Sequence, residues 1–162
     1  MQYSFQMVAS IYTYKNQYAD ALKIVEENVI FSDKADPVYK TITNVSLASL
    51  YRNTKNYKKA LEASKNALNI YEKSRFQQKY LADLYKQLAA DYINVKQNDS
   101  AYVYFWKAIE VYKAFGNKNL AANLLNFITL QKDEGGDVQT AEKWNEEAFK
   151  LVDPGSSWNE TI

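Results

Sequence analysis

A tyrosine lies nine residues before an alanine at three similar places in this chain of 162 residues. The pairs are Tyr12 and Ala21, Tyr51 and Ala60, and Tyr92 and Ala101. Around each pair, apolar residues recur at intervals of three and four, and none of these segments alternates as a strand would. With only four glycines and two prolines in the chain, the pattern predicts pairs of helices joined by short turns.

The segment 44–71 shows this pattern most clearly. An apolar stripe runs through Val45, Leu47 and Tyr51 and is interrupted at 54–56, and a second stripe begins at Tyr57. The interruption contains Asn56, a residue type that tolerates a left-handed turn conformation or caps the helix that follows. We therefore interpret 44–71 as a helical hairpin.

The same hairpin can be aligned on 5–29, 85–109 and 125–149. The alanines that share one position are 21, 60, 101 and 141, so the period is near 40 residues. The fourth copy differs, with Lys132 at the tyrosine position and Gly135-Gly136 in its turn. Two helices cross closely where a small residue lies at the contact, and a hairpin cannot bury its stripe alone. We therefore predict stacked hairpins with Ala60 and Ala101 buried.

These residues resemble the tetratricopeptide repeat (TPR), in a long-repeat variant like that of kinesin light chains and of bacterial regulatory arrays. The family pattern is matched by Leu47-Ala48, Tyr51, Ala60 and Ala67, and again by Leu88-Ala89, Tyr92, Ala101 and Ala108. The resemblance implies an all-α fold, a right-handed α-α superhelix (solenoid) of four antiparallel helical hairpins. A HEAT-like array has a similar period but leaves the tyrosine-to-alanine register unexplained.

The expected domain is a TPR-like helical repeat domain over 1–152, followed by a flexible tail over 153–162. Its repeats are approximately 2–35, 36–73, 74–116 and 117–152. The expected helices lie near 2–15, 18–32, 37–54, 57–72, 75–96, 99–115, 118–133 and 138–152. Asp36-Pro37 is a typical helix start. Because Met1 is followed at once by helical pattern and no polar capping helix is present, we expect a piece of a larger array or protein.

Composition excludes several kinds of chemistry. The absence of His and Cys excludes disulfides, thiolate chemistry and histidine-based catalysis. Glu146 and Glu147 do not converge as two catalytic carboxylates would, because neighbours on a helix point about 100° apart. The other acidic pair, Asp133-Glu134, lies at an expected turn and is interpreted as solvated surface. Gly135-Gly136 lies in no phosphate-binding motif. We expect no enzyme activity, no metal site and no cofactor.

Charge and hydropathy limit the classes of partner that the protein is expected to bind. The net charge is +1, with eight basic against three acidic residues in 36–75 and two against eight in 133–162. We expect a protein or peptide ligand, no nucleic acid and no membrane, with intramolecular contact to further domains as an alternative. No signal sequence or apolar span is evident. The sequence does not fix the compartment, and a soluble, cytoplasmic protein is favoured.

The resemblance implies that the first helix of each hairpin lines a concave groove that holds peptides. The candidate groove residues, off the packing stripe, are Gln6, Tyr14, Ser49, Arg52, Asn53, Lys86, Asn94 and Asn126. An asparagine amide can pair with both the N–H and the C=O of a peptide backbone, and a cation can bind an acidic group. The alternative is that these side chains contact only water. The Lys, Asn and Arg set of a carboxylate clamp is not found here.

The expected function is a non-catalytic protein- or peptide-binding scaffold that uses this concave groove. The alternative is a sensor or regulatory segment of a larger signalling protein, with a kinase or transcription-regulator domain outside this sequence. Trp158, in the tail, is a further candidate anchor for a partner.

Overall fold

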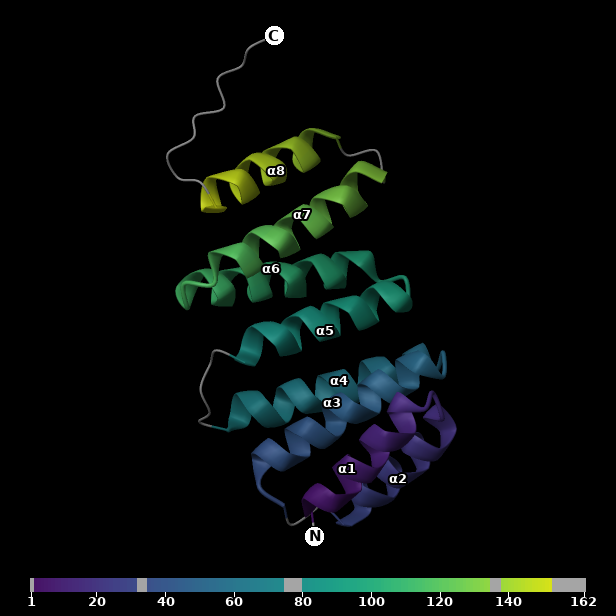
Figure 1. Cartoon of the computed structure of the whole chain (residues 1–162). Coiled ribbons are helices and arrows are strands. Elements are labelled where there is room, and N and C mark those ends of the chain that lie inside the picture. The colour runs from purple at the N-terminus through teal and green to yellow at the C-terminus, as the bar shows by residue number, and fades with distance from the viewer. Residues whose placement is uncertain (1, 32–34, 75–79, 135–137, 153–162) are drawn as a thin grey trace.

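The computed structural model describes residues 2–31, 35–74, 80–134 and 138–152, and within these ranges there are eight α-helices and no β-strand (Figure 1). The helices are α1 (Gln2–Tyr14), α2 (Tyr18–Phe31), α3 (Pro37–Asn53), α4 (Tyr57–Lys73), α5 (Leu81–Asn94), α6 (Asn98–Ala114), α7 (Lys118–Glu134) and α8 (Val138–Val152). The expected boundaries agree to within about two residues where they can be compared. The expected start of the fifth helix, the Gly135-Gly136 turn and the tail with Trp158 lie outside the described residues.

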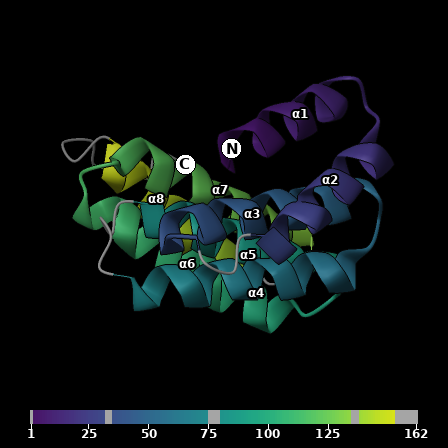
Figure 2. The same cartoon turned by 90° about the horizontal axis from the view of Figure 1, so that it is seen from below.

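The helices pack in sequential pairs. In each hairpin the first helix contacts the second, and the second helix then contacts the first helix of the next hairpin. The hairpins therefore form a stack with α1 and α2 at one end and α8 at the other (Figure 1). The view along the stack shows α1 standing to one side of the other helices (Figure 2). This arrangement confirms the predicted solenoid of four antiparallel hairpins.

The turns explain the spacing of tyrosine and alanine. After α1, α3 and α5 the chain reverses through a residue with positive φ: Asn16, Lys55 and Lys96. In each turn the next residue donates its N–H to the tyrosine carbonyl, as Asn56 does to Tyr51 at 2.8 Å. A second bond, from the Lys55 N–H to the Arg52 carbonyl at 2.9 Å, completes the Schellman motif. The motif places the tyrosine two residues before the last residue of its helix. The alanine then falls at the first close crossing of the next helix.

The same spacing, with the same kind of turn, also occurs where two hairpins are joined. Tyr112 precedes Ala121 by nine residues, and Gly116 between α6 and α7 has a φ of 72°. Asn117 donates to the Tyr112 carbonyl at 2.8 Å. This pair is not among those predicted from the sequence, because the motif was expected only within hairpins.

Side chains cap the starts of α3 and α4. Asp36 accepts a bond from the Tyr39 N–H and Pro37 is the first residue of α3, as predicted. Asn56 caps α4 by accepting from the Lys59 N–H. At the other end of α4, Ser74 follows the last helical residue, and its hydroxyl donates to the Tyr71 carbonyl.

The buried residues form two clusters. One joins α1 and α2 to α3 and α4, and the other runs from the end of α4 through α8. Ala21, Ala60, Ala101 and Ala121 have no exposed surface, which confirms the prediction for Ala60 and Ala101. The side chain of Ala141 lies outside the described residues. The core thus depends on small residues at the crossings with large residues beside them.

Candidate functional site: the face formed by the first helices

Residues of different hairpins are equivalent when they lie at the same distance from the alanines 21, 60, 101 and 141. By this alignment, Gln6, Val45 and Lys86 are equivalent, as are Ser10, Ser49 and Ala90. All six line one of two hollows on the same face of the stack. The first helices therefore present equivalent positions to a shared surface, which we call the groove face.

The hollow between α3, α5, α6 and α7 is mainly apolar and has a volume of about 460 Å³. Buried Phe105 and Tyr112 from α6 lie at its base, and Leu120 and Phe127 from α7 line one side. Leu120 and Phe127 are 47% and 45% exposed. Such a volume accommodates a bulky side chain of a ligand.

The second hollow lies between α1 and α3 and has a volume of about 490 Å³. It is lined by Gln6, Ala9, Ser10, Thr13, Tyr14, Val25, Val45, Ser46, Ser49 and Leu50. Its hydroxyls from Ser10 and Thr13 donate to carbonyls of their own helix. The side-chain amide nitrogen of Gln6 is buried and has no partner within the part of the chain that the structure describes. This hollow thus offers a hydrogen-bond donor at its wall.

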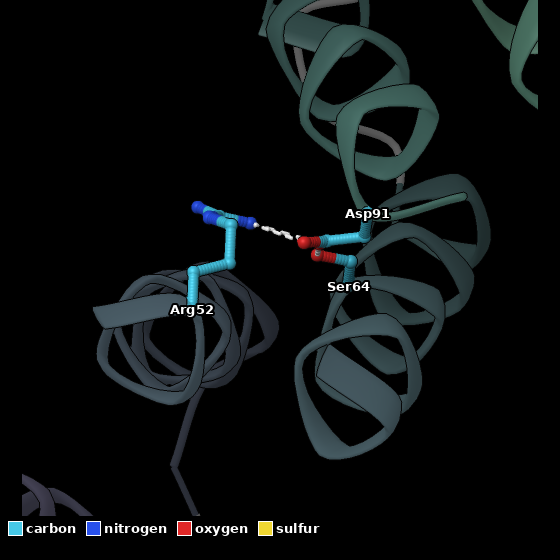
Figure 3. A network of polar contacts seen from close by, with 3 residues as sticks. All are labelled: Arg52, Ser64 and Asp91. Carbon is cyan, nitrogen blue, oxygen red and sulfur yellow. Dashed lines mark hydrogen bonds and ion pairs between the residues drawn. The ribbon is translucent and has the colours of Figure 1, made fainter. Parts of the chain in front are cut away.

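Arg52 lies at the border of the apolar hollow and is bound within the protein (Figure 3). Its Nη1 donates to both carboxylate oxygens of Asp91, at 3.0 and 2.8 Å. Ser64 on α4 donates to the same carboxylate at 2.5 Å. Asp91 is fully buried and the Arg52 side chain is 24% exposed. Arg52 therefore holds α3 against α5 while part of its guanidinium faces solvent.

Lys86 and Tyr112 form a second polar cluster on the same hollow. Tyr112 donates its hydroxyl to Asp83 at 2.6 Å. Lys86 donates to Asp83 at 3.2 Å and to the Tyr112 hydroxyl at 3.4 Å. Burial, with the hydrogen bond to Asp83, raises the pKa of Tyr112 well above its ordinary value. Because the Lys86 side chain remains 46% exposed, its ammonium can still meet an acidic group of a ligand.

The structure divides the predicted groove residues into three sets. Gln6, Tyr14 and Ser49 line the hollow between α1 and α3, and Arg52 and Lys86 line the apolar hollow. Asn53, Asn94 and Asn126 are exposed but line neither hollow.

The apolar part of the groove face was not predicted from the sequence. Leu120, Asn123 and Phe127 line the hollow together, and they lie on one helix at intervals of three and four. That spacing was visible in the sequence. Without the packing of α6 against α7, however, such a stripe is indistinguishable from core.

The described residues contain no group of three or more acidic side chains placed to hold a metal ion. Glu146 and Glu147 are bound in different directions, Glu146 to Lys150 within α8 and Glu147 to Lys113 on α6. The pair therefore does not form a two-carboxylate site. The side chains of Asp133 and Glu134 lie outside the described residues. Among the helices that the structure describes, none is long and apolar enough to span a membrane.

The fold and its groove face define a TPR-like helical solenoid. No family model matches the sequence, and no curated protein matches it. Solved structures match closely in shape, however, at low sequence identity.

Three of these structures illustrate the match. BtubC from P. vanneervenii has a TM-score of 0.76 at 19% identity, over 98% of this chain and 64% of that one. The nearly identical TPR-like repeats of a putative kinesin light chain from Podosopora anserina give 0.78 at 15% identity, over 96% and 76%. MamA gives 0.72 at 18% identity, over 94% and 79%. These likenesses confirm the fold that the repeat predicted.

Proposed function

We propose that the protein is a non-catalytic scaffold that holds a peptide segment of a partner protein along its groove face. The observation that carries this proposal is the apolar hollow, where Leu120 and Phe127 stay nearly half exposed beside Lys86. Covering apolar surface is favourable by about 25 cal/mol per Å². A ligand side chain that covers these two residues would therefore gain free energy from apolar burial.

The polar residues around the hollows suit a peptide backbone. Asn123 lies in the apolar hollow, and Asn53 and Asn94 are exposed at equivalent ends of α3 and α5. Each amide can donate to a peptide carbonyl and accept from a peptide N–H. Lys86 adds a preference for an acidic residue next to the apolar anchor. Gln6, Tyr14 and Ser49 would extend the contact along α1 and α3.

The comparisons support a binding role. One structure with this fold, with a TM-score of 0.70 at 16% identity, is that of a hetero-tetramer, Cut9–Hcn1 of the APC/C. Binding in the groove would serve either role that the sequence suggests, a stand-alone adaptor or the regulatory segment of a larger signalling protein.

The test is selection of peptides from a random display library on the immobilised protein, followed by titration of the selected peptides. The Phe127→Asp variant should bind them at least about tenfold more weakly, a loss of about 1.4 kcal/mol, because it places a charge in the apolar hollow. The Asn53→Ala/Asn94→Ala variant should weaken them by a similar factor. The matched control is Val103→Asp, at a residue of α6 that is 54% exposed and lines neither hollow.

Equal affinity of the wild type and Phe127→Asp would place the site elsewhere. The basic surface of 36–75 would then be the next candidate. Loss of binding in the Val103→Asp control as well would show that the selected peptides bind without specificity for the groove face.

A further inference from the structure

An exposed and mainly apolar stripe runs along α7. Leu120, Asn123, Phe127 and Leu130 follow one another at alternating intervals of three and four residues, and all four are exposed. Leu130 is 62% exposed. The residues between them that pack into the core are Ala121, Ala122, Leu124, Leu125, Ile128 and Thr129. We call the four exposed residues the α7 stripe.

The α7 stripe belongs to the groove face and not to an end of the stack. The residues of α3 and α5 that are equivalent to Phe127 and Leu130 are Ser46, Ser49, Gln87 and Ala90. All four line one of the two hollows, although a further hairpin follows both α3 and α5. These positions therefore border open space in hairpins that lie inside the array.

The apolar surface runs along α7 and not across the stack, because α3 and α5 carry small or polar residues where α7 carries Phe127 and Leu130. From Leu120 to Leu130 the stripe is about 15 Å long, at 1.5 Å per residue. Intervals of three and four form the narrow seam along which a second helix packs, whereas an extended chain has a period of two. A helix that lies along α7 therefore covers the stripe better than an extended chain does.

Two features of the α7 stripe favour such a helix. The Phe127 ring packs edge-on against Phe105 of α6, with 5.6 Å between the ring centroids. This contact fixes the ring while nearly half of the residue stays exposed. Asn123 lies in the same seam, and a polar residue in a helical seam selects the register of the partner helix. The stripe thus combines a rigid apolar anchor with a polar position that sets the alignment.

Charge distinguishes one flank of the ligand from the other. The charged side chains that line the hollow beside the α7 stripe are both cations, Arg52 and Lys86. Asp83, which accepts from Lys86, does not line the hollow. The part of α7 from Lys118 to Leu130 contains no acidic residue. The flank of a ligand that faces α5 therefore meets positive charge.

We propose that the groove face binds an amphipathic helix of a partner protein along α7, with acidic residues on the flank that faces α5. The inference rests on the proposed function and names the conformation and the chemistry of the segment that is held. The partner helix covers the α7 stripe with apolar residues and places a polar residue against Asn123, and its acidic flank reaches Lys86. The chain beyond this helix follows α5 and α3, past Asn94 and Asn53.

The test selects binders of the whole protein from two displayed peptide libraries of about two heptads each. In the first library, apolar residues are fixed at intervals of three and four with glutamates along one flank, and the other positions vary. The second library has the same composition, but its apolar residues alternate with polar ones. The best binders of the first library should have at least about tenfold higher affinity than those of the second.

Variants of the protein test the direction of the ligand. Leu130 lines neither hollow, so it contributes only to a ligand that follows α7. Leu130→Asp should raise the dissociation constant of the selected helical peptides at least about tenfold. Val103→Asp is the matched control and should bind them as the wild type does. Circular dichroism of both variants confirms that the helices are retained.

A change of charge tests the acidic flank. Replacing the glutamates of a selected peptide by lysines should weaken its binding by about fivefold. Lys86→Gln should reduce this difference between the two peptides, because it removes the ammonium that the acidic flank meets. An undiminished difference in Lys86→Gln would overturn the assignment of the acidic flank to the side of α5.

The outcomes separate this inference from the proposed function. Selected peptides that lose affinity for Phe127→Asp but bind Leu130→Asp as they bind the wild type would overturn the helix along α7 and leave the groove-face site in place. Binders that come only from the alternating library would do the same. Binders from either library that are insensitive to both variants would overturn the inference and the proposed function together, as would the absence of binders from both libraries.

Discussion

Asp91 is the residue that departs most from the repeat. The equivalent residues Ile11 and Leu50 are apolar, yet a fully buried carboxylate occupies this position in the third hairpin. Arg52 and Ser64 satisfy it from α3 and α4. Burying an ion pair costs desolvation that the attraction repays only when the geometry is good. The cluster therefore fixes how α5 sits on the preceding hairpin and adds little net stability.

Replacing Arg52 alone should lower the free energy of unfolding more than replacing Arg52 and Asp91 together. Arg52→Met leaves the buried Asp91 carboxylate without its cation and should lower the free energy of unfolding by about 3 kcal/mol. The double variant Arg52→Met/Asp91→Leu, which places at 91 the apolar residue type of the first two hairpins, should recover most of this loss. Urea denaturation measures both. A double variant as unstable as Arg52→Met would show that the unpaired carboxylate is not the cause.

At the scale of the elements, four turns share a residue with positive φ, but the type of residue at that position differs between them. Gly116 adopts a positive φ without a side chain, whereas Asn16, Lys55 and Lys96 adopt it with one. A side chain in the left-handed region costs roughly 1–2 kcal/mol because Cβ approaches the following carbonyl oxygen. The lysine turns thus store a small strain that the packing of the hairpins offsets.

Adding a side chain at Gly116 should lower the stability of the fold, and removing the side chain at Lys96 should raise it. A Cβ added at Gly116 meets no atom within 4 Å, so Gly116→Ala should cost only the backbone strain, about 1 kcal/mol. Lys96→Gly should raise the free energy of unfolding by up to a similar amount, and Lys96→Ala, which keeps the strain, is its control. Thermal unfolding measures all three. Destabilisation by Lys96→Gly would mean that chain entropy outweighs the strain.

At the scale of the whole molecule, tyrosine hydroxyls link successive hairpins. Tyr51 of α3 donates to Glu26 of α2 at 2.6 Å, and Tyr85 of α5 donates to Glu72 of α4 at 3.0 Å. Burial, followed by the hydrogen bond and the charge of Glu26, raises the pKa of Tyr51 to about 12. Burial and Glu72 raise the pKa of Tyr85 to about 12 in the same way.

These shifts predict how stability depends on alkaline pH. Because the folded pKa of both tyrosines lies above the unfolded value of about 10, their stabilisation is complete below about pH 10 and is lost as the pH rises toward 12. Tyr51→Phe/Tyr85→Phe should therefore lose stability less steeply over this window. Urea midpoints between pH 9 and 12 measure the slope, with Tyr57→Phe at an exposed tyrosine as the control. Equal slopes in the double variant and the control would contradict this.

The sequence predicted the helices and the turns within hairpins, which depend on neighbours along the chain. Apolar intervals of three and four determine helices, and the spacing of Tyr51 and Ala60 determines a short turn followed by a close crossing. Repetition of that spacing near every 40 residues predicts stacking, because one hairpin cannot bury its own stripe. The sequence also predicted that the first helices of the hairpins carry Gln6, Ser49, Arg52 and Lys86 toward a common face.

Only the tertiary structure decided which side chains meet across that face. Arg52 and Asp91 are 39 residues apart, and nothing near either one indicates that the predicted ligand-binding cation is bound to a buried carboxylate. The apolar hollow likewise requires Phe105 of α6 and Phe127 of α7 to lie at a particular rotation and separation. Helix periodicity determines the face on which a residue lies, whereas the distance between faces depends on how all the crossings pack together.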